Sequence, residues 1–295
     1  MTDTIEPREE PWTIKRVIAW ASEDLKKRGN PSPRLDVELL LGKVLNVPRV
    51  KLVIDAERPL QKDELASYRA LHQRRRKGEP VAYLLGVREF YGRPFRVDKR
   101  VLIPRPDTET LVEVALRRTA ACSLSMRALD LCTGSGCVAI TIARERPTAR
   151  VIGSDVSEDA LTVARDNQVR LAAFNVAFLR GDLFAIPTKN RPEKFDLVTA
   201  NPPYIPRDEA GELQVDIRDF EPHVALFGGD DGLAIVRRIV DEAPRHLAPG
   251  GVLAMEIGAG QAPDVIALFE ARGFRSVEAA KDYGGHQRVV SGVWD

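Results

Sequence analysis

The segment Asn201–Tyr204 has the sequence Asn-Pro-Pro-Tyr, and its groups suit chemistry on a planar amino group. The amide of Asn201 offers both hydrogen-bond donors and an acceptor, and Tyr204 supplies a flat aromatic face. The carbonyl group of Pro202 has no partner within a strand. Together these groups suit a ligand such as a carboxamide or the edge of a nucleobase. The alternative is a turn that ends a strand and packs its tyrosine.

The preceding residues predict the element that positions this segment. Residues 195–200 form a short apolar run that contains β-formers, which indicates a buried strand. Pro202 and Pro203 cannot donate to a strand ladder, and a residue before proline is pushed away from helical dihedral angles, so the strand must end at Asn201. Asn201 and Tyr204 are therefore expected at the carboxyl edge of a sheet. Ligands bind at this edge in open α/β sheets.

A second group of residues predicts a loop that contacts a ligand through its backbone. Residues 128–131 form a short apolar strand, which is followed by the loop Cys132-Thr133-Gly134-Ser135-Gly136 and a helix over 137–146. The glycines allow a sharp turn and a close approach to a ligand, and the start of the helix adds free N–H groups. Asp130, within the strand, is either a capping acid or part of the site.

The next two predicted strands also lead to acidic residues. Residues 151–153 lead to Asp155, 21 positions after the first glycine of the loop, where an acid accepts hydrogen bonds from both ribose hydroxyls of an adenosine. Residues 176–179 lead to Asp182 and Leu183, which could bracket an adenine. Taken alone, the glycine loop with Asp155 also fits a nicotinamide dinucleotide. A dehydrogenase has no need of the Asn-Pro-Pro-Tyr segment, so the combination favours a transferase that acts on a planar NH2 group.

Arg105 is held between Pro104 and Pro106, ahead of a predicted helix. The prolines restrict its backbone. Asp107 or Thr108 is expected to cap the helix. A guanidinium held in this way suits a carboxylate, which belongs either to a ligand or to a neighbouring acidic residue. Both partners stay open from the sequence.

The first part of the chain, residues 1–84, is predicted to be a small helical domain. Apolar residues at helical spacing indicate three helices, over 12–28, from Pro33 and from Gln61. In the second helix, Leu35 and residues 39–41 are expected to point inward. The third helix ends in the basic run 74–77, whose charges either complement the helix dipole or contact an acidic or RNA-bearing partner.

The rest of the chain is predicted to be an α/β domain preceded by a connector. Aromatic and β-branched residues around two glycines indicate a β-hairpin within the connector, residues 85–106. In residues 107–295, strands alternate with helices, which predicts a mostly parallel sheet with helices on both faces. The later elements are expected as helices over 158–172, 231–247 and 263–272, and as strands over 251–257, near Val277 and over 288–292.

Composition narrows the class of protein. The 295 residues hold 44 basic and 43 acidic side chains, so nothing predicts bulk electrostatic binding to nucleic acid. Three cysteines without a Cys-x-x-Cys pair and four scattered histidines complete no metal-site spacing, and Cys132 and Cys137 are interpreted as core-edge residues. The first residues are acidic and polar, unlike a signal peptide, and no apolar stretch approaches 18 residues. We expect a cytoplasmic protein without a metal.

The motifs together resemble the class I S-adenosylmethionine-dependent methyltransferases, through DLCTGSG, GSD at 153–155, GDLF at 181–184 and NPPY at 201–204. Over nearly the whole chain, the sequence is similar to the protein-glutamine methyltransferases of translational release factors, through EPVAYLLGVREF, LIPRPDTE, NPPYIP, FEPHVALFGGDDGL and DYGGHQRVV. The resemblance implies a Rossmann-like α/β fold whose seven-stranded sheet has its last strand antiparallel. It implies S-adenosyl-L-methionine as methyl donor and S-adenosyl-L-homocysteine as product. The implied substrate is the glutamine in the Gly-Gly-Gln motif of class 1 peptide chain release factors.

The resemblance also implies roles for individual residues. The cofactor site would comprise Cys132, Thr133, Gly134, Ser135, Gly136, Asp155, Asp182, Leu183, Asn201 and Arg105, with Asp155 on the ribose and Asp182 and Leu183 beside the adenine. The substrate clamp would comprise Asn201, Pro202, Pro203 and Tyr204. Within this clamp, Asn201, Pro202 and Tyr204 would be the catalytic residues. The helical domain would recognise the protein substrate.

Two other substrates stay open. Cys132 stands where the release-factor enzymes usually have glycine, and DLCTGSGC is similar to the sister enzyme that methylates a glutamine of a large-subunit ribosomal protein. LIPRPDTE and DYGGHQRVV favour the release-factor branch. A nucleic-acid amino methyltransferase would use the same segment on a flipped adenine or cytosine, but the near-neutral charge balance does not predict the basic groove it needs. We expect a monomer that requires neither a membrane nor direct contact with nucleic acid.

Overall fold

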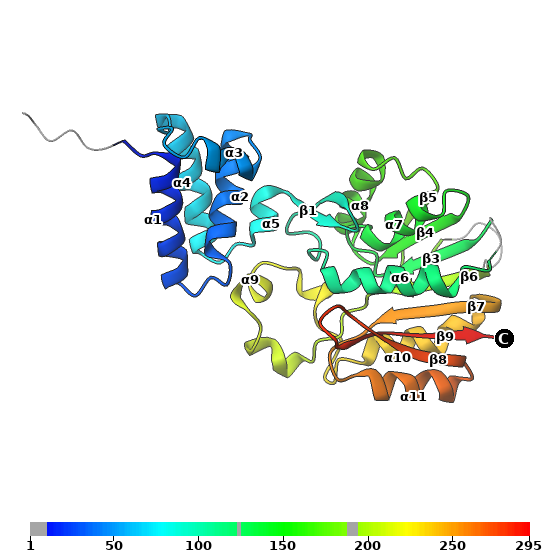
Figure 1. Ribbon diagram of the computed structural model, residues 1–295. Coiled ribbons are helices and arrows are strands. Elements are labelled where there is room, and N and C mark those ends of the chain that lie inside the picture. Colours follow the sequence, from blue (N-terminus) through cyan, green and yellow to red (C-terminus); the bar gives the residue numbers. More distant parts are fainter. Residues whose placement is uncertain (1–10, 123–124, 188–193) are drawn as a thin grey trace, which may run out of the picture. The chain divides into compact units, whose positions relative to one another are not determined.

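The chain divides into two units, one up to Leu85 and one from Gly86 onward, and Figure 1 shows the elements of each. The computed structural model describes residues 11–122, 125–187 and 194–295. Among the described residues, the first unit buries one cluster of hydrophobic side chains and the second unit buries two. The loops that the sequence predicts to contact a ligand all belong to the second unit.

The first unit is helical, as expected. Its helices are α1 (Ile14–Lys27), α2 (Pro33–Leu45), α3 (Arg49–Ile54), α4 (Lys62–Arg76) and α5 (Val81–Leu85). The sequence did not predict the short helices α3 and α5. The expectation for Leu35 is wrong, because the buried stripe of α2 runs through Val37, Leu40 and Leu41 and Leu35 lies on the opposite side of the helix, 40 % exposed.

The basic run at the end of α4 binds acidic side chains of its own unit. Arg74 pairs with Glu79, Arg75 with Asp36 and Arg76 with Asp24, at N–O distances of 2.5, 2.7 and 3.0 Å. The Arg75–Asp36 pair is nearly inaccessible to water. Arg75 and Arg76 therefore link α4 to α2 and to α1.

The second unit opens with the expected hairpin, formed by β1 (Val87–Phe90) and β2 (Arg93–Arg96). Tyr91 and Gly92 connect the strands with φ angles of 52° and 70°. Two successive residues with positive φ give the turn whose twist matches a pair of antiparallel strands. Phe90 and Phe95 are buried, so the hairpin is anchored in the core of the second unit.

A seven-stranded sheet organises the second unit, in the order β5-β4-β3-β6-β7-β9-β8. Its strands are β3 (Arg127–Leu131), β4 (Arg150–Asp155), β5 (Val176–Arg180), β6 (Phe195–Ala200), β7 (Leu247–Glu256), β8 (Arg275–Lys281) and β9 (Gln287–Trp294). Neighbouring strands from β5 to β7 are parallel, whereas β9 is antiparallel to both β7 and β8. This confirms the fold class that the sequence predicts.

Helices cover both faces of this sheet (Figure 1). One face carries α6 (Glu109–Arg118), α7 (Cys137–Glu145) and α8 (Glu158–Arg170), and the other carries α10 (Ala234–Glu242) and α11 (Ala262–Arg272). Neighbouring strand residues alternate between the faces, so Leu197 packs in the first layer and Val198 in the second. Short turns are η1 (Pro106–Thr108), η2 (Arg207–Gly211), α9 (Val215–Arg218), η3 (His223–Ala225) and η4 (Ala243–Arg245).

The expected helix over 231–247 is too long at both ends. Helix α10 covers only Ala234–Glu242, the turn η4 follows it, and Leu247 already begins β7. Pro244 explains the early end, since its ring clashes with the preceding turn of a continuing helix. The start is late because the residues before Ala234 form a loop that packs against the Asn-Pro-Pro-Tyr segment, where a Cβ at Gly232 would lie 2.3 Å from the carbonyl oxygen of Tyr204.

Among the described residues, no helix has both the length and the apolar character needed to cross a bilayer. The same residues hold no group of three or more His, Cys, Asp or Glu side chains arranged for a metal ion. Cys122, Cys132 and Cys137 carry free thiols.

Candidate active site

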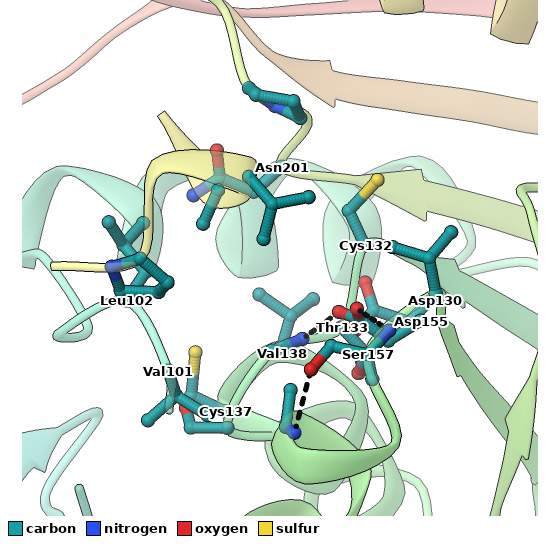
Figure 2. Close-up of a pocket in the computed structure, with 18 of the residues that line it drawn as sticks. Val101, Leu102, Asp130, Cys132, Thr133, Cys137, Val138, Asp155, Ser157 and Asn201 are labelled. Carbon is teal, nitrogen blue, oxygen red and sulfur yellow. Dashed lines mark hydrogen bonds between the residues drawn. The ribbon is translucent and has the colours of Figure 1, made fainter. Parts of the chain in front are cut away.

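The carboxyl ends of strands β3 to β6 surround a cavity of about 290 Å³. Figure 2 shows its labelled side chains, with Val101 and Leu102 on the side opposite Cys132 and Asp155. Of the predicted site residues, the wall contains Arg105, Cys132, Thr133, Gly134, Ser135, Asp155, Asp182, Leu183, Asn201 and Pro203. Gly136, Pro202 and Tyr204 are not among the residues that line it.

The loop after β3 owes its shape to residues in the left-handed region. Cys132, Gly134 and Gly136 have φ angles of 55°, 53° and 79°. At Gly136, an added Cβ would lie 2.8 Å from the ring of Phe178, so only glycine fits between the loop and β5. Cys132 adopts the left-handed conformation without being glycine, which strains its backbone. Cys132 is partly buried, and burial raises the pKa of its thiol above the ordinary range, so the thiol is neutral and a poor nucleophile at pH 7.

Asp155, at the end of β4, ties the loop to its own strand. One carboxylate oxygen accepts from the N–H of Gly134 at 2.9 Å, and the other accepts from the N–H of Ser157 at 3.0 Å. Burial raises the pKa of Asp155, and these backbone hydrogen bonds oppose the rise. Each oxygen keeps a second lone pair, so the carboxylate has acceptor capacity left on the side of the cavity.

Asp130 lines the cavity, so of the two roles that the sequence left open, a capping acid or a part of the site, the structure supports the second. Its two oxygens accept from the hydroxyls of Thr133 at 2.6 Å and Thr199 at 2.8 Å. Burial raises the pKa of Asp130 to about 7, with the two threonine hydroxyls opposing the rise. Asp130 therefore fixes the loop to β6 and also places a titratable group at the floor of the site.

Asp182 and Leu183 line the wall beyond β5. Leu183 is buried with a φ of 53°, and its carbonyl accepts a long hydrogen bond of 3.4 Å from the hydroxyl of Ser154. Asp182 is half-exposed and pairs with Arg238 of α10 at 2.9 Å. The acid is thus held at the rim of the cavity, with an apolar neighbour beside it.

Asn201 ends β6 as predicted, and its amide is oriented by a threonine. Its Nδ2 donates to the hydroxyl of Thr108 at 3.2 Å. Thr108 is buried at the junction of η1 and α6, 93 positions earlier in the chain. Its side chain does not cap α6, contrary to the capping role that the sequence left open between Asp107 and Thr108. This hydrogen bond uses one of the two N–H groups of Nδ2 and leaves the acceptor atom of the amide, Oδ1, for a ligand.

The rest of the Asn-Pro-Pro-Tyr segment packs against β7. Pro202 is buried, Pro203 reaches the cavity, and the hydroxyl of Tyr204 donates to Oε1 of Glu256 at 3.3 Å. Burial raises the pKa of Tyr204, and the nearby charge of Glu256 raises it further. The phenol is therefore neutral and serves as a donor over the whole physiological range.

Arg105 lines the cavity, and its partner is a neighbouring acidic residue. The guanidinium pairs with Glu221 at 2.5 Å. Glu221 is almost fully buried and also accepts from the N–H of Ile103 at 3.2 Å. Burial raises the pKa of Glu221, and Arg105 opposes the rise. The pair ties the segment before η1 to the segment after β6.

Sequence reasoning missed two parts of the wall. Val101 and Leu102 come from the segment before η1, and Pro222, Val224 and Ala225 come from the region of η3. Apolar residues beside rigid prolines were the available signal in both segments. Glu256 was also missed, because a single acid at the end of an apolar strand has no distinctive pattern.

Sequence comparisons place these features in a known context. A family profile described as "PrmC N-terminal domain" matches residues 16–86, and one described as "Methyltransferase domain" matches residues 123–267. The chain is 43 % identical to the release factor glutamine methyltransferase of Geobacter sulfurreducens over 96 % of its length and 97 % of that protein. It is 41 % identical to the enzyme of the same name from Vibrio cholerae, over 96 % of this chain and 97 % of that one.

A structural comparison agrees at the level of the fold. A crystal structure of a methyltransferase from Pyrococcus furiosus matches with a TM-score of 0.51 and 19 % identity, covering 79 % of this chain and 98 % of that one. Identity at this level bears on the fold alone. The sequence relatives cover nearly the full length of both chains at more than 40 % identity, and both units are included. The chain belongs to the family of release factor glutamine methyltransferases.

Proposed function

We propose that this protein transfers a methyl group from S-adenosyl-L-methionine to the side-chain amide nitrogen of the glutamine in the Gly-Gly-Gln motif of class 1 peptide chain release factors. The observation that carries the proposal is the position of Asn201, which opens onto the same cavity as the glycine loop and Asp155. The relatives that match over 96 % of this chain are named release factor glutamine methyltransferase, which supports a release factor as the substrate.

The residues in the cavity fit the proposed methyl donor. Asp155 has free acceptor capacity for ribose hydroxyls, and Gly134 lets the backbone approach a ligand closely. Asp182 and the apolar Leu183 form a rim suited to an adenine and its amino group. When bound, S-adenosyl-L-methionine supplies an electrophilic methyl group on a positively charged sulfur. We propose that Cys132, Thr133, Ser135 and Gly136 complete this site, with Arg105 acting from across the cavity.

The Asn-Pro-Pro-Tyr segment would hold the substrate amide. The lone pair of an amide nitrogen is delocalised, so the nitrogen is a poor nucleophile. Oδ1 of Asn201 and the carbonyl of Pro202 would accept from its two N–H groups, with Tyr204 packed against the amide plane. Positive charge grows on the nitrogen as it reacts, so these contacts strengthen most in the transition state. No general base is needed, because the methylated nitrogen is strongly acidic and water takes its proton.

We propose that the helical unit, residues 1–84, recognises the release factor, with residues 85–106 as connector and residues 107–295 as the catalytic domain. The first unit matches a family profile of its own, apart from that of the methyltransferase domain, which supports a separate role such as substrate choice. We further propose a monomer that acts in the cytoplasm, where its substrates meet ribosomes, and that requires neither a membrane nor direct contact with nucleic acid.

Methyl transfer to a purified release factor tests the function. The protein is incubated with S-adenosyl-L-methionine labelled in the methyl group and with a release factor, and incorporated label is counted. We expect label on the wild-type release factor and none on a variant whose Gly-Gly-Gln glutamine is replaced by alanine. Label on the large-subunit ribosomal protein or on oligonucleotides, with none on the release factor, would overturn the proposal.

A further inference from the structure

Five apolar residues on two distant segments of the chain form part of the cavity wall. We call this group the apolar lip, and it consists of Leu102, Pro104, Pro222, Val224 and Ala225. Figure 2 shows Leu102 on the side of the cavity opposite Asp155, the proposed ribose acceptor. At Leu102 the lip therefore borders a part of the cavity that lies away from the proposed ribose position.

Backbone hydrogen bonds tie the second segment of the lip to the Asn-Pro-Pro-Tyr segment. The N–H of Ile205 donates to the carbonyl of Leu226 at 3.0 Å, and the N–H of Gly228 donates to the carbonyl of Ile205 at 2.9 Å. Ile205 directly follows Tyr204, and Leu226 directly follows Ala225. The lip thus lies beside the segment that we propose to hold the substrate amide.

Glu221 connects the two segments of the lip. Its Oε2 atom accepts from the N–H of Ile103 at 3.2 Å, and its Oε1 atom accepts from the guanidinium of Arg105 at 2.5 Å. Ile103 and Arg105 stand on either side of Pro104, and Glu221 directly precedes Pro222. The side chain of Glu221 is 1 % exposed. A buried carboxylate therefore links the two halves of the lip through both of its oxygens.

Stability alone gives little reason for this arrangement. A buried ion pair loses the hydration of both charges, and an apolar pair of similar volume often stabilises a fold as well or better. Pro104 and Pro222 also restrict the backbone of the two segments at the points where Glu221 joins them. The ion pair and the prolines together indicate that the lip must keep a fixed shape.

Val224 lies at the mouth of the cavity, because it lines the cavity and is also 61 % exposed. A glutamine within a protein can place only its side chain beside Asn201. Its own backbone and the neighbouring residues stay at the mouth, where the lip lies. A side chain on a neighbouring residue would then meet apolar groups that cannot move aside, whereas glycine brings no side chain.

We propose that the apolar lip determines substrate specificity, because it contacts the residue before the target glutamine and leaves room there only for glycine. Glu221 is a positioning residue, which keeps the lip in place through Ile103 and Arg105. This inference rests on the proposed function and adds to it the surface that distinguishes a Gly-Gly-Gln glutamine from other glutamines.

The test combines a variant of the lip with a variant of the substrate. In the release factor, the glycine directly before the glutamine is replaced by alanine, and kcat/KM for methyl transfer is measured on both factors. One added methyl group in a tight site is worth about 1–3 kcal/mol, so the wild type should lose roughly 10-fold or more on the altered factor. Val224→Ala makes room for that methyl group. It should recover at least about threefold of the loss, as expected for groups in contact.

Val169→Ala is the matched control for Val224→Ala. Val169, on α8, is 69 % exposed and is not among the residues that line the cavity. The change of side chain is the same, so this variant should show the full wild-type loss on the altered factor. Both variants should bind S-adenosyl-L-methionine as the wild type does, which calorimetry measures.

Glu221→Gln tests the positioning role. Glutamine keeps the shape but has one acceptor oxygen, so one of the two links to the first segment is lost. With the lip free to move, the ratio of kcat/KM between the normal and the altered factor should shrink by at least about threefold. A purely structural defect would lower kcat/KM on both factors equally and leave this ratio unchanged.

The outcomes separate this inference from the proposed function. Absence of methyl transfer by the wild type to the normal release factor overturns the function itself. Transfer with equal kcat/KM on the two factors, or with the same loss in Val224→Ala as in the wild type, overturns the role of the lip. An unchanged ratio in Glu221→Gln overturns the positioning role of Glu221.

Discussion

The Asn201 amide makes the sharpest prediction at the scale of single residues. Replacing it by alanine removes an acceptor that gains strength as charge develops, so turnover should fall on the order of 100-fold or more. Cofactor affinity should be largely intact, because the loop after β3 and Asp155 are untouched. Single-turnover methyl transfer and calorimetry measure the two quantities. Near-normal turnover in Asn201→Ala would show that Asn201 is not a catalytic residue.

Asp155 makes the complementary prediction, on binding rather than turnover. Asp155→Ala removes the proposed ribose acceptor and also the hydrogen bond that holds Gly134. Hydrogen bonds to a charged group contribute about 1.5–3 kcal/mol each, so the dissociation constant for S-adenosyl-L-methionine should rise by roughly one to two orders of magnitude. Calorimetry checks this, with Asp159→Ala as control, since Asp159 is exposed on the following helix. Unchanged affinity in Asp155→Ala would exclude the ribose role.

At the scale of elements, close packing between the glycine loop and the strands beside it determines the shape of the site. A Cβ at Gly153 of β4 would lie 2.6 Å from the ring of Phe178 and 2.8 Å from the hydroxyl of Thr133. Overpacking of this kind costs about 1–3 kcal/mol. Gly153→Ala should therefore lower the free energy of unfolding by that amount and weaken cofactor binding, because Thr133 belongs to the loop.

Urea denaturation of Gly153→Ala and of Gly211→Ala measures the free energy of unfolding of both variants. The difference between them separates the cost of overpacking from the effect of replacing a glycine by alanine. Gly211 has no heavy atom within 4 Å of the added Cβ and no positive φ. Its variant should unfold at the wild-type urea concentration. Equal midpoints for the two variants would contradict the packing argument.

The elements that carry the predicted site followed from the sequence because their signals are local. The apolar residues of β3, two glycines of the loop and the start of α7 lie close together within residues 128–146. The pair of prolines after Asn201 shows where β6 ends. The parallel order then brings the strand ends together without further information. Local signals also gave one wrong prediction, that Leu35 points inward. The spacing of apolar residues predicted a helix there but did not show which side of α2 faces the core.

Contacts between distant residues could not be predicted in this way. Thr108 reaches Asn201 across 93 positions, and Arg105 reaches Glu221 across 116. The sequence favoured a capping role for residues 107–108 because a helix begins there. The fold assigns the Thr108 hydroxyl to Asn201 instead, since η1 supplies the first turn before α6 and leaves that hydroxyl free of the helix. Which hydrogen-bond partner each of these side chains takes is seen only in the folded structure.

At the scale of the whole molecule, buried acids should make stability depend on pH. The pKa of Asp130 is raised by burial to about 7, while an unfolded aspartate has a pKa of about 3.9. Between these values the folded chain keeps a proton that the unfolded chain has released, so the free energy of unfolding falls as the pH rises through this window. The fall due to one such group is at most about 1.4 kcal/mol per pH unit.

Asp130→Asn removes this contribution, so its free energy of unfolding should fall less between pH 5 and pH 7 than that of the wild type. Fluorescence of Trp294 in urea follows the second unit alone when Trp12 and Trp20, the other tryptophans, are replaced by phenylalanine. Parallel pH dependences for Asp130→Asn and its parent would show that Asp130 titrates normally in the folded chain.

The order of the last two strands bears on how the chain is made. Strand β8 precedes β9 in synthesis, yet it joins the sheet through β9, which lies between β8 and β7. A chain that ends after β8 but before β9 therefore leaves the backbone groups of β8 unpaired, and β7 presents an open edge. Such edges attract other chains. A chain that ends between residues 282 and 286 should therefore aggregate more readily than the full-length chain.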